Sequence, residues 1–173
     1  MAEPDARANL PWYKRLGLRV ATPRFVRKFL GPKVFAKADR WMLERTKGRL
    51  TVFGPPIFPT LVLTTTGRRS GEPRKVSLVY APLDGAIHVV ASNWAREHHP
   101  AWSENLLANP GADVISKEGS FPVRAHLLDA EEKKEAWPGL VELMPQWDFY
   151  TTITDRDLRV FRLDRASEGA DAT

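Results

Sequence analysis

The 173-residue sequence predicts a small antiparallel β-barrel with peripheral helices, an α+β fold in which strands dominate. About six short segments have the alternating or β-branched pattern of strands, and turn residues separate them at roughly ten-residue spacing. Most connections are short enough for hairpins, which join neighbouring strands antiparallel. We therefore expect a barrel rather than a doubly wound parallel sheet.

The composition excludes several classes of protein. It is 43% hydrophobic and 27% charged, as in ordinary globular domains, and its length favours one domain with a substantial core. Because there are no cysteines, disulfides, thiolate metal sites and cysteine nucleophiles are excluded. The N-terminus lacks the apolar core of a secretory signal, and no apolar run approaches the roughly 18 residues that would span a bilayer. We expect a cytoplasmic protein.

Charge is distributed unevenly along the chain. Residues 1–50 carry 13 Lys/Arg against 4 Asp/Glu, a net +9, whereas the remaining residues carry 13 against 17, a net −4. A nucleic-acid-binding protein would be basic over its folded body, so the sequence predicts no nucleic-acid partner. It predicts instead a basic N-terminal arm (residues 1–48), a barrel domain (49–165) and a frayed tail (166–173).

Two helices are predicted within the basic arm, one from Pro23 and one from Pro32 to about Lys47-Gly48. Such an amphipathic pair can lie on an anionic membrane surface, where each cation contributes about 1 kcal/mol. Its apolar stripe can equally pack on the barrel and leave the cations in solvent. Both alternatives stay open, so a peripheral location at the inner face of the membrane is one expectation.

The first predicted hairpin joins Leu61–Thr66 to Lys75–Tyr80 through a loop that contains two glycines. The turn at Pro82–Gly85 leads into a nearly all-apolar strand, Ala86–Ala91. A polar loop, Ser92–His99, follows this strand.

A helix should begin at Pro100 and end before Pro110, whose ring cannot continue it. Further strands are predicted at Ala112–Ser116 and Pro122–Leu128. Asp129 is suited to cap a helix whose acidic residues lie in the first turn. Pro138 interrupts this helix, yet Leu140–Leu143 continues the helical pattern. An aromatic and polar stretch (145–157) and a last strand, Leu158–Leu163, complete the barrel.

The loop after Thr66 concentrates cationic and hydroxyl side chains. It is not a P-loop, because its glycines are too close and no Lys-Ser/Thr pair follows, and Ser70 lies too far from Gly67 for a serine-hydrolase elbow. One reading is a solvated hairpin tip. The other is an anion site that holds the phosphate of an acidic cofactor, since guanidinium and backbone N–H groups converge there.

Two further groups of residues are candidates for a site. In one, the strand end Ala91–Trp94 precedes a helix N-terminus, which suits a bound ring or phosphate. Trp102 in this helix either forms a wall of the site or anchors the core. In the other, Trp147 and Tyr150 share a helical face, and the tyrosine hydroxyl can donate a proton or can help to close the barrel. The four histidines have no metal-binding spacing, so no metal is expected.

Four stretches in order, LVLTTTGRRSGEPRKVSLVY, VVASNW, PAWSENLLANP and WPGLVELMPQWDFYTTITDR, resemble the deazaflavin (F420)-dependent nitroreductase family over about residues 50–165. The resemblance implies a split β-barrel similar in fold to flavin-dependent pyridoxamine-phosphate oxidases. It also implies coenzyme F420, a deazaflavin with a phosphodiester and an oligoglutamate tail. In two places the chain departs from the family pattern: Asn93–Arg96 fills a loop that usually carries two glycines, and Met144 stands where a tyrosine is frequent.

The resemblance also implies a set of site residues. Those that would contact the cofactor are Arg68, Arg69, Ser70, Arg74, Lys75, Val76, Ser77, Leu78, Val79, Ala91, Ser92, Asn93, Trp94, Ala101, Trp102 and Asn105. Those that would contact the substrate are Trp94, Met144, Trp147 and Tyr150. Tyr150 and Ser92 are the candidate catalytic residues, as proton donors to the product.

The implied function is an oxidoreductase that transfers hydride from reduced F420 to an electron-poor small molecule, namely an enone, a quinone or a nitroaromatic. One alternative is a non-catalytic protein that binds F420 or a lipid with the same barrel. Another is an FMN-dependent enzyme of the related oxidases. The sequence does not decide between a monomer and a homodimer.

Overall fold

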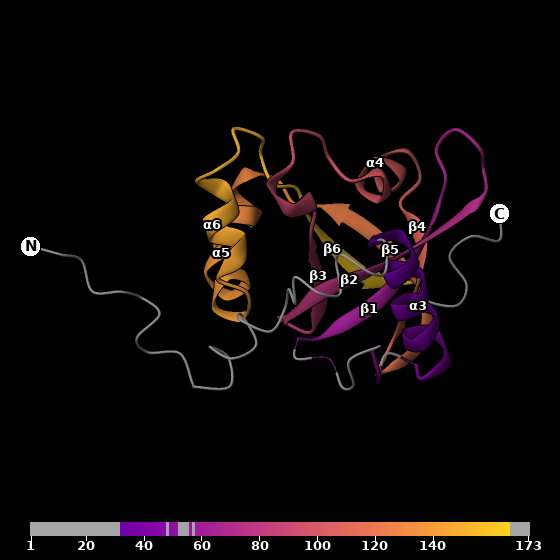
Figure 1. Ribbon diagram of the computed structural model, residues 1–173. Coiled ribbons are helices and arrows are strands. Elements are labelled where there is room, and N and C mark those ends of the chain that lie inside the picture. The colour runs from indigo at the N-terminus through magenta and orange to yellow at the C-terminus, as the bar shows by residue number, and fades with distance from the viewer. Residues whose placement is uncertain (1–31, 48, 52–55, 57, 167–173) are drawn as a thin grey trace, which may run out of the picture. The chain divides into compact units, whose positions relative to one another are not determined.

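The computed structural model describes residues 32–47, 49–51, 56 and 58–166 (Figure 1). The chain divides into two compact units, Met1–Ala38 and Asp39–Thr173, and the barrel lies within the second. The helix predicted from Pro23 and the glycine expected to end the next helix lie outside the described residues, as does most of the predicted tail. The division of the chain into arm, barrel and tail stays a prediction.

Six antiparallel strands close into a barrel in the order β1-β2-β3-β6-β5-β4. Each neighbour pairs antiparallel, from Thr60 opposite Val79 in the first hairpin to Leu127 opposite Phe161 between the last two strands. The predicted antiparallel barrel is therefore confirmed. The strands are β1 (Thr60–Thr66), β2 (Pro73–Leu83), β3 (Ala86–Val90), β4 (Gly111–Ser116), β5 (Gly119–Leu127) and β6 (Val160–Arg165).

Four α-helices accompany the strands in the described part of the chain: α3 (Pro32–Arg45), α4 (Ala101–Ala108), α5 (Ala130–Leu143) and α6 (Gln146–Thr151). Asp129 caps α5 as predicted, since its carboxylate accepts from the backbone N–H groups of Glu131 and Glu132. Pro138 lies inside α5, and the helix continues to Leu143, as the pattern after the proline predicted. Within the described residues, no helix combines the length and apolar character needed to cross a bilayer.

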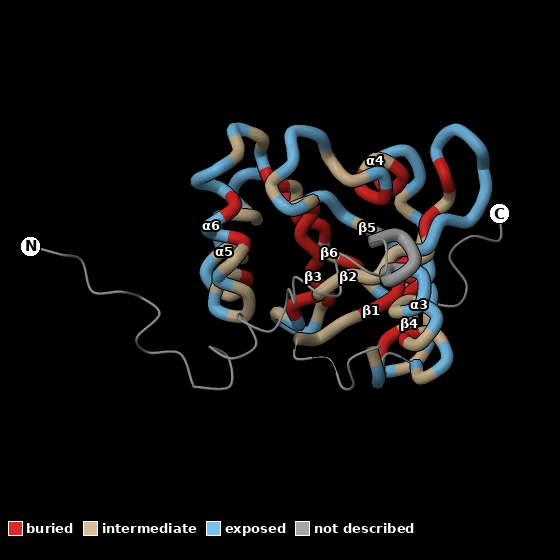
Figure 2. The backbone as a smooth tube through the Cα atoms, in the orientation of Figure 1, coloured by how far each residue is buried: buried red, intermediate tan, exposed pale blue. Residues whose placement is uncertain are grey.

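Two apolar clusters hold the fold together (Figure 2). The first fills the barrel, where Leu61, Tyr80 and Phe161 are at most 1% exposed. The second lies on the outer face of β2, β3 and β6, where α5 and α6 bring Leu140 and Tyr150 against the strands. The pleat explains both clusters, because successive residues of a strand point to opposite faces of the sheet.

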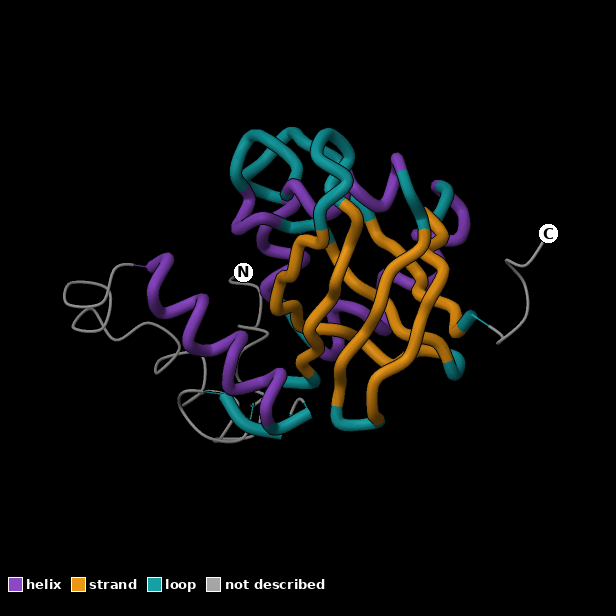
Figure 3. The backbone as a smooth tube through the Cα atoms, turned by 90° about the vertical axis from the view of Figure 1, so that its right-hand side faces the viewer, coloured by secondary structure: helices purple, strands orange, loops and turns teal. Residues whose placement is uncertain are grey.

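Three connections lie at the same end of the barrel. The loop between β1 and β2, the segment from β3 to α4 and the segment from α6 to β6 are all at the upper edge of Figure 1. Antiparallel topology requires this, because β1 and β3 end where β2 and β6 begin. Figure 3 shows the crossed strands from the side, with loops gathered at that end. Polar residues far apart in the sequence therefore meet here.

Candidate cofactor and substrate site

The first turn at this end, Gly67–Glu72, is held by its own backbone. The N–H of Gly67 donates to the carbonyl of Glu72 at 2.8 Å, and the N–H of Gly71 donates to the carbonyl of Gly67 at 2.8 Å. Gly71 has φ +69°, in the left-handed region that favours glycine. A β-carbon at Gly67 would lie 2.7 Å from Ser70 Oγ and 3.1 Å from the carbonyl oxygen of Glu72, so this turn leaves no room for a side chain there.

Asn105 of α4 fixes this turn to the barrel. Its Oδ1 accepts from the backbone N–H of Arg68 at 3.1 Å, and its Nδ2 donates to the hydroxyl of Thr65 at 3.0 Å. Asn105 is only 5% exposed, so both ends of its amide are used inside the protein. It was predicted to contact the cofactor, and its bonds give it a share in the site as the residue that orients the cationic turn.

Guanidinium groups outnumber carboxylates around the turn. Glu104 of α4 accepts from Arg159 Nη1 at 2.6 Å and from Arg68 Nη1 at 3.4 Å. The hydrogen bond from Arg159 is the main reason that the pKa of Glu104 is lowered, so this carboxylate is ionised at neutral pH. Two cations thus share one anion, and a net positive charge remains beside the turn.

The other cationic residues of the predicted site differ in the hydrogen bonds and ion pairs that they form. Arg74 Nη2 donates to Ser70 Oγ at 3.2 Å, which steadies both side chains at the turn. Lys75 forms an ion pair with Glu44 of α3 at 3.1 Å. Arg69 is exposed and has no hydrogen bond or ion pair with any residue in the described part of the chain. Arg69 and Arg74 are therefore the cations most available to an anionic ligand.

The pleat of β2 divides the predicted contacts between two faces. Val76 and Leu78 pack against the cluster inside the barrel, whereas Val79 packs against the outer cluster. Ser77 shares the outer face, and its hydroxyl is buried without a partner among the described residues. Only the outer face can meet a ligand that also reaches α6, so Ser77 and Val79 fit such a ligand better than Val76 and Leu78.

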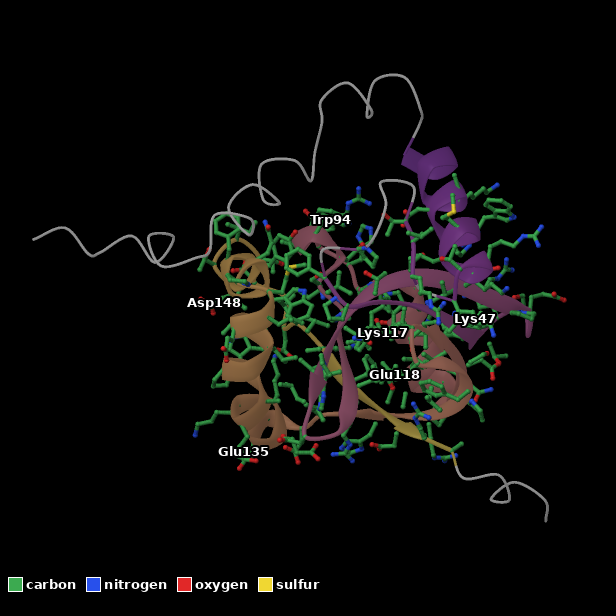
Figure 4. All side chains as sticks on the ribbon, turned by 90° about the horizontal axis from the view of Figure 1, so that it is seen from below. Lys47, Trp94, Lys117, Glu118, Glu135 and Asp148 are labelled. Atoms are coloured by element: carbon green, nitrogen blue, oxygen red, sulfur yellow. The ribbon has the colours of Figure 1, made fainter. Side chains whose placement is uncertain are left out.

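A second turn, Asn93–Ala95, follows β3 and carries Trp94 (Figure 4). All three residues are left-handed, with φ of 47°, 57° and 57°, although none is glycine. Trp94 is 73% exposed and projects from the surface. Next to this turn the hydroxyl of Ser92 has no hydrogen-bond partner among the described residues, while the carbonyl of Ser92 accepts from Ala95 N–H at 2.9 Å.

Arg156 surrounds this second turn with hydrogen bonds, and sequence reasoning gave it no role. It donates to the carbonyls of Ser92 and Arg96 at 2.7 and 3.1 Å, to that of Ala91 at 3.1 Å, and to Nδ1 of His99 at 2.9 Å. These partners lie 57 to 65 residues away, a separation at which no local pattern exists. Burial lowers the pKa of His99, and Arg159 and Arg156 lower it further, so its neutral imidazole can accept.

Three of the four predicted substrate residues come together in the outer apolar cluster, and Trp94 is not one of them. Trp147 and Tyr150 are 4% and 8% exposed on one face of α6, as their spacing predicted, and Met144 packs beside them. This burial matches the alternative in which these aromatic residues help to close the barrel, and their contact with a substrate stays a prediction. Ala95 of the second turn joins the same cluster, so the turn and α6 are neighbours. Burial raises the pKa of Tyr150, which keeps its hydroxyl protonated at neutral pH.

Three predicted contacts lie elsewhere. Trp102 is 7% exposed inside the barrel, with its ring centroid 5.7 Å from that of Phe161, which matches the core-anchor alternative. Ala91 is fully buried in the same cluster, while its carbonyl reaches Arg156. Ala101 is exposed at the first position of α4. Among the described residues, no group of His, Asp or Glu could hold a metal ion.

This arrangement suits a ligand with an anionic part and a planar part. The first turn supplies cations, and the outer cluster supplies an apolar wall with a protonated phenol and an unpartnered serine hydroxyl. Anions gain most from guanidinium groups that are already oriented, and aromatic side chains suit planar rings.

Comparison with known proteins gives one family. Residues 36–164 match the family described as F420H(2)-dependent quinone reductase. The Mycobacterium tuberculosis protein Rv1261c, named an F420H(2)-dependent quinone reductase, is 33% identical over 102 residues, which are 59% of this chain and 68% of that protein. A second protein of this species, Rv3178, is 31% identical over 111 residues, which are 64% of this chain and 92% of that one.

Solved structures agree with this match. A structure described as an F420-H2 dependent reductase, FDR-A, is 36% identical with a TM-score of 0.57, and it covers 61% of this chain and 94% of its own. Another, described as a domain-swapped dimer, is 34% identical with a TM-score of 0.58 and covers 72% of this chain and 96% of its own.

Proposed function

The chain belongs to the F420H(2)-dependent quinone reductase family and is an F420H2-dependent oxidoreductase, and we propose that the acceptor it reduces is a quinone. The observation that carries the proposal is the presence of two different environments at the same end of the barrel. One is the turn with Arg68, Arg69 and Arg74, and the other is the apolar cluster with Trp147 and Tyr150. A polyanionic cofactor and a planar acceptor need these two environments.

The residues present fit F420. Its phosphodiester and oligoglutamate tail would lie against Arg69 and Arg74, whose guanidinium groups form no ion pair with a carboxylate among the described residues. The unpartnered hydroxyl of Ser77 offers a hydrogen bond on the face of β2 that Val79 and α6 share. When bound, reduced F420 supplies the hydride.

The protein's part is to orient the acceptor, exclude water and hold a proton. Trp147 and Met144 form an apolar wall that excludes water, and Trp94 stands exposed at the neighbouring turn. Reduction of a quinone to a quinol requires a proton in addition to the hydride. Tyr150 Oη is kept protonated by burial, and Ser92 Oγ has no hydrogen-bond partner in the part of the chain that the structure describes, so each is a proton donor in this proposal.

The test is turnover of F420H2 with menadione, cyclohexenone and a nitroimidazole. The rate is measured as the loss of F420H2 absorbance. We expect the highest kcat/KM with menadione. Tight F420 binding with no acceptor reduced would favour the non-catalytic binder, and preference for the nitroimidazole would favour a nitroreductase. A purified protein that is yellow with an FMN spectrum would favour the FMN-dependent alternative.

Association of residues 1–48 with an anionic membrane surface stays a prediction. Within the described part of this arm, Arg40 donates to the backbone carbonyl of Lys75 at 2.7 Å, Glu44 pairs with Lys75, and Leu43 is fully buried. These contacts support packing on the barrel for Asp39–Arg45. Membrane association therefore concerns the residues before them.

A further inference from the structure

The Asn93–Ala95 turn is in a conformation that its own residues do not favour. For an L-residue, a left-handed backbone brings the β-carbon close to the following carbonyl oxygen, and only asparagine and aspartate offset this cost locally. Asn93 does so, since its Nδ2 donates to the carbonyl of His98 at 2.8 Å. Trp94 and Ala95 have no such compensation, so contacts from outside the turn must stabilise it.

Arg156 provides those contacts on both sides of the turn. Its bonds to Ala91 and Ser92 fix the chain before the turn, and its bonds to Arg96 and His99 fix the chain after it. Among the described residues it forms no ion pair with a carboxylate. The planar guanidinium fork of Arg156 therefore contacts both ends of the turn and fixes the distance between them. A single ammonium group cannot reproduce this geometry.

The same bonds argue against a direct role for Arg156 as an anion ligand. Its Nε and both terminal nitrogens already donate to protein acceptors, whereas Arg69 donates to none among the described residues. Its guanidinium is also buried enough for its pKa to be lowered by desolvation. Arg156 thus differs from the exposed Arg68, Arg69 and Arg74 by facing inward.

We propose that Arg156 is a positioning residue: its fork holds the left-handed Asn93–Ala95 turn and thereby fixes Trp94 beside the outer cluster, where it sets the affinity for the acceptor. The acceptor part rests on the proposed function. The turn part does not, because it concerns only contacts within the chain. Ala95 belongs to the cluster that contains Trp147 and Tyr150, so a shift of the turn moves one wall of the acceptor site.

The experiment compares Arg156→Lys with Arg162→Lys in the full-length protein. Both variants keep the charge, and Arg162 pairs with Asp164 on β6, away from the turn. Trypsin cleavage after the exposed Arg96 reports opening of the turn without any ligand. In Arg156→Lys we expect roughly tenfold faster cleavage there, because at least one charge-assisted bond to the segment is lost and cleavage follows the open population. Arg162→Lys should match the wild type.

Activity gives the second readout. Arg156→Lys should raise KM for menadione about tenfold, by the same lost bond, with the F420 dissociation constant unchanged. Trp94→Ala should raise this KM too, and in the Trp94→Ala background Arg156→Lys should add nothing to KM while it still accelerates cleavage. If the effects of Trp94→Ala and Arg156→Lys on KM multiplied in the double variant, Arg156 would not act through Trp94. If Arg156→Lys left the cleavage rate unchanged, Arg156 would not hold the turn.

A further variant keeps the test informative if Arg156→Lys does not fold. His99→Ala removes one acceptor of the Arg156 guanidinium and should accelerate cleavage after Arg96 by a smaller factor. No change in that variant, with Arg156→Lys unfolded, would count against the proposal. If no quinone is reduced by the wild type, the proposed function fails, but the cleavage results still decide whether Arg156 holds the turn.

Discussion

The two turns that follow β1 and β3 reach left-handed geometry by different means. Gly67–Glu72 places glycine at its left-handed position and closes with backbone bonds inside the turn. Asn93–Ala95 places three residues with side chains there and depends on an arginine some 60 positions further along. The first is determined locally and the second by tertiary contacts, so they should respond differently to substitution.

Arginine has opposite roles in the two turns. In the first, Arg68, Arg69 and Arg74 lie on the surface and face solvent or a ligand. In the second, Arg156 is turned inward and donates to backbone carbonyls. A count of cations near the site would treat all four as anion ligands. Their hydrogen bonds distinguish three arginines at the surface from one that donates to backbone carbonyls.

The largest effect should come from removing the outward cations. Arg68→Ala together with Arg69→Ala should weaken F420 binding by roughly 10²-fold or more, since charge-assisted hydrogen bonds contribute about 1.5–3 kcal/mol each. A riboflavin-like deazaflavin fragment that lacks the phosphate should bind as before. Calorimetry or quenching of tryptophan fluorescence measures both affinities.

Arg165→Ala is a matched control for this prediction. Arg165 is an exposed arginine that pairs with Glu118 at the hairpin between β4 and β5, the other end of the barrel. Its removal should leave F420 affinity unchanged. Equal losses for F420 and the fragment in the double variant would mean that Arg68 and Arg69 do not bind the phosphate.

Substitutions that change the backbone preference of each turn should change the free energy of unfolding by an intermediate amount. The change should differ between the two turns in sign or in magnitude. Gly71→Ala places a β-carbon at φ +69° and should destabilise the protein by about 1 kcal/mol, or about 2–4 °C in Tm. Ala95→Gly removes the same crowding but loses chain entropy and some packing, so its effect should lie within about 0.5 kcal/mol of zero.

Thermal unfolding of both variants checks this. Gly111→Ala controls for glycine substitution in general, because Gly111 does not have a positive φ and an added β-carbon would meet no atom closer than 3.4 Å. If Ala95→Gly lost as much stability as Gly71→Ala, the second turn would not carry the conformational strain that its φ values indicate.

Local signals explain why most of the fold was predictable. The hairpin from β1 to β2 follows from alternation and its glycine loop, and Asp129 follows from a capping pattern three residues long. The continuation of α5 through Pro138 has a physical reason as well. Proline in a helix removes one backbone bond, and packing of Leu140 and Leu143 in the outer cluster is enough to keep α5 continuous.

The site was predictable only where chemistry coincides with local sequence. The cationic turn and the face shared by Trp147 and Tyr150 could be found from residue type and spacing. The sequence does not show which face of β2 is covered, because an apolar cluster packs on each face of this strand. It therefore could not separate Val76 and Leu78 from Ser77 and Val79. Arg156 could not be found, because its partners are distant backbone carbonyls, which any sequence provides.

The smallest expected effect concerns Glu104, the carboxylate that links the two regions through Arg68 and Arg159. Because its pKa in the folded protein is lowered, its stabilisation is fully present above the unfolded value near 4.5 and is lost as pH falls through the folded pKa. Glu104→Gln should therefore have a lower Tm than the wild type at pH 7, by the equivalent of about 0.2–1 kcal/mol, and the difference should disappear toward pH 3. Glu118→Gln, in the exposed pair with Arg165, is the matched control.

The same substitution also tests the roles assigned to the arginines. Glu104→Gln frees Arg68 and Arg159 from their shared anion, so F420 should bind somewhat more tightly at low ionic strength, and the gain should shrink as salt rises. Cleavage after Arg96 should stay at the wild-type rate, because Arg156 has no bond to Glu104. Tighter F420 binding with an unchanged rate of cleavage after Arg96 would show, in a single variant, that Arg68 acts on the ligand independently of the turn that Arg156 holds. Weaker F420 binding would instead mean that Glu104 orients Arg68 for the ligand.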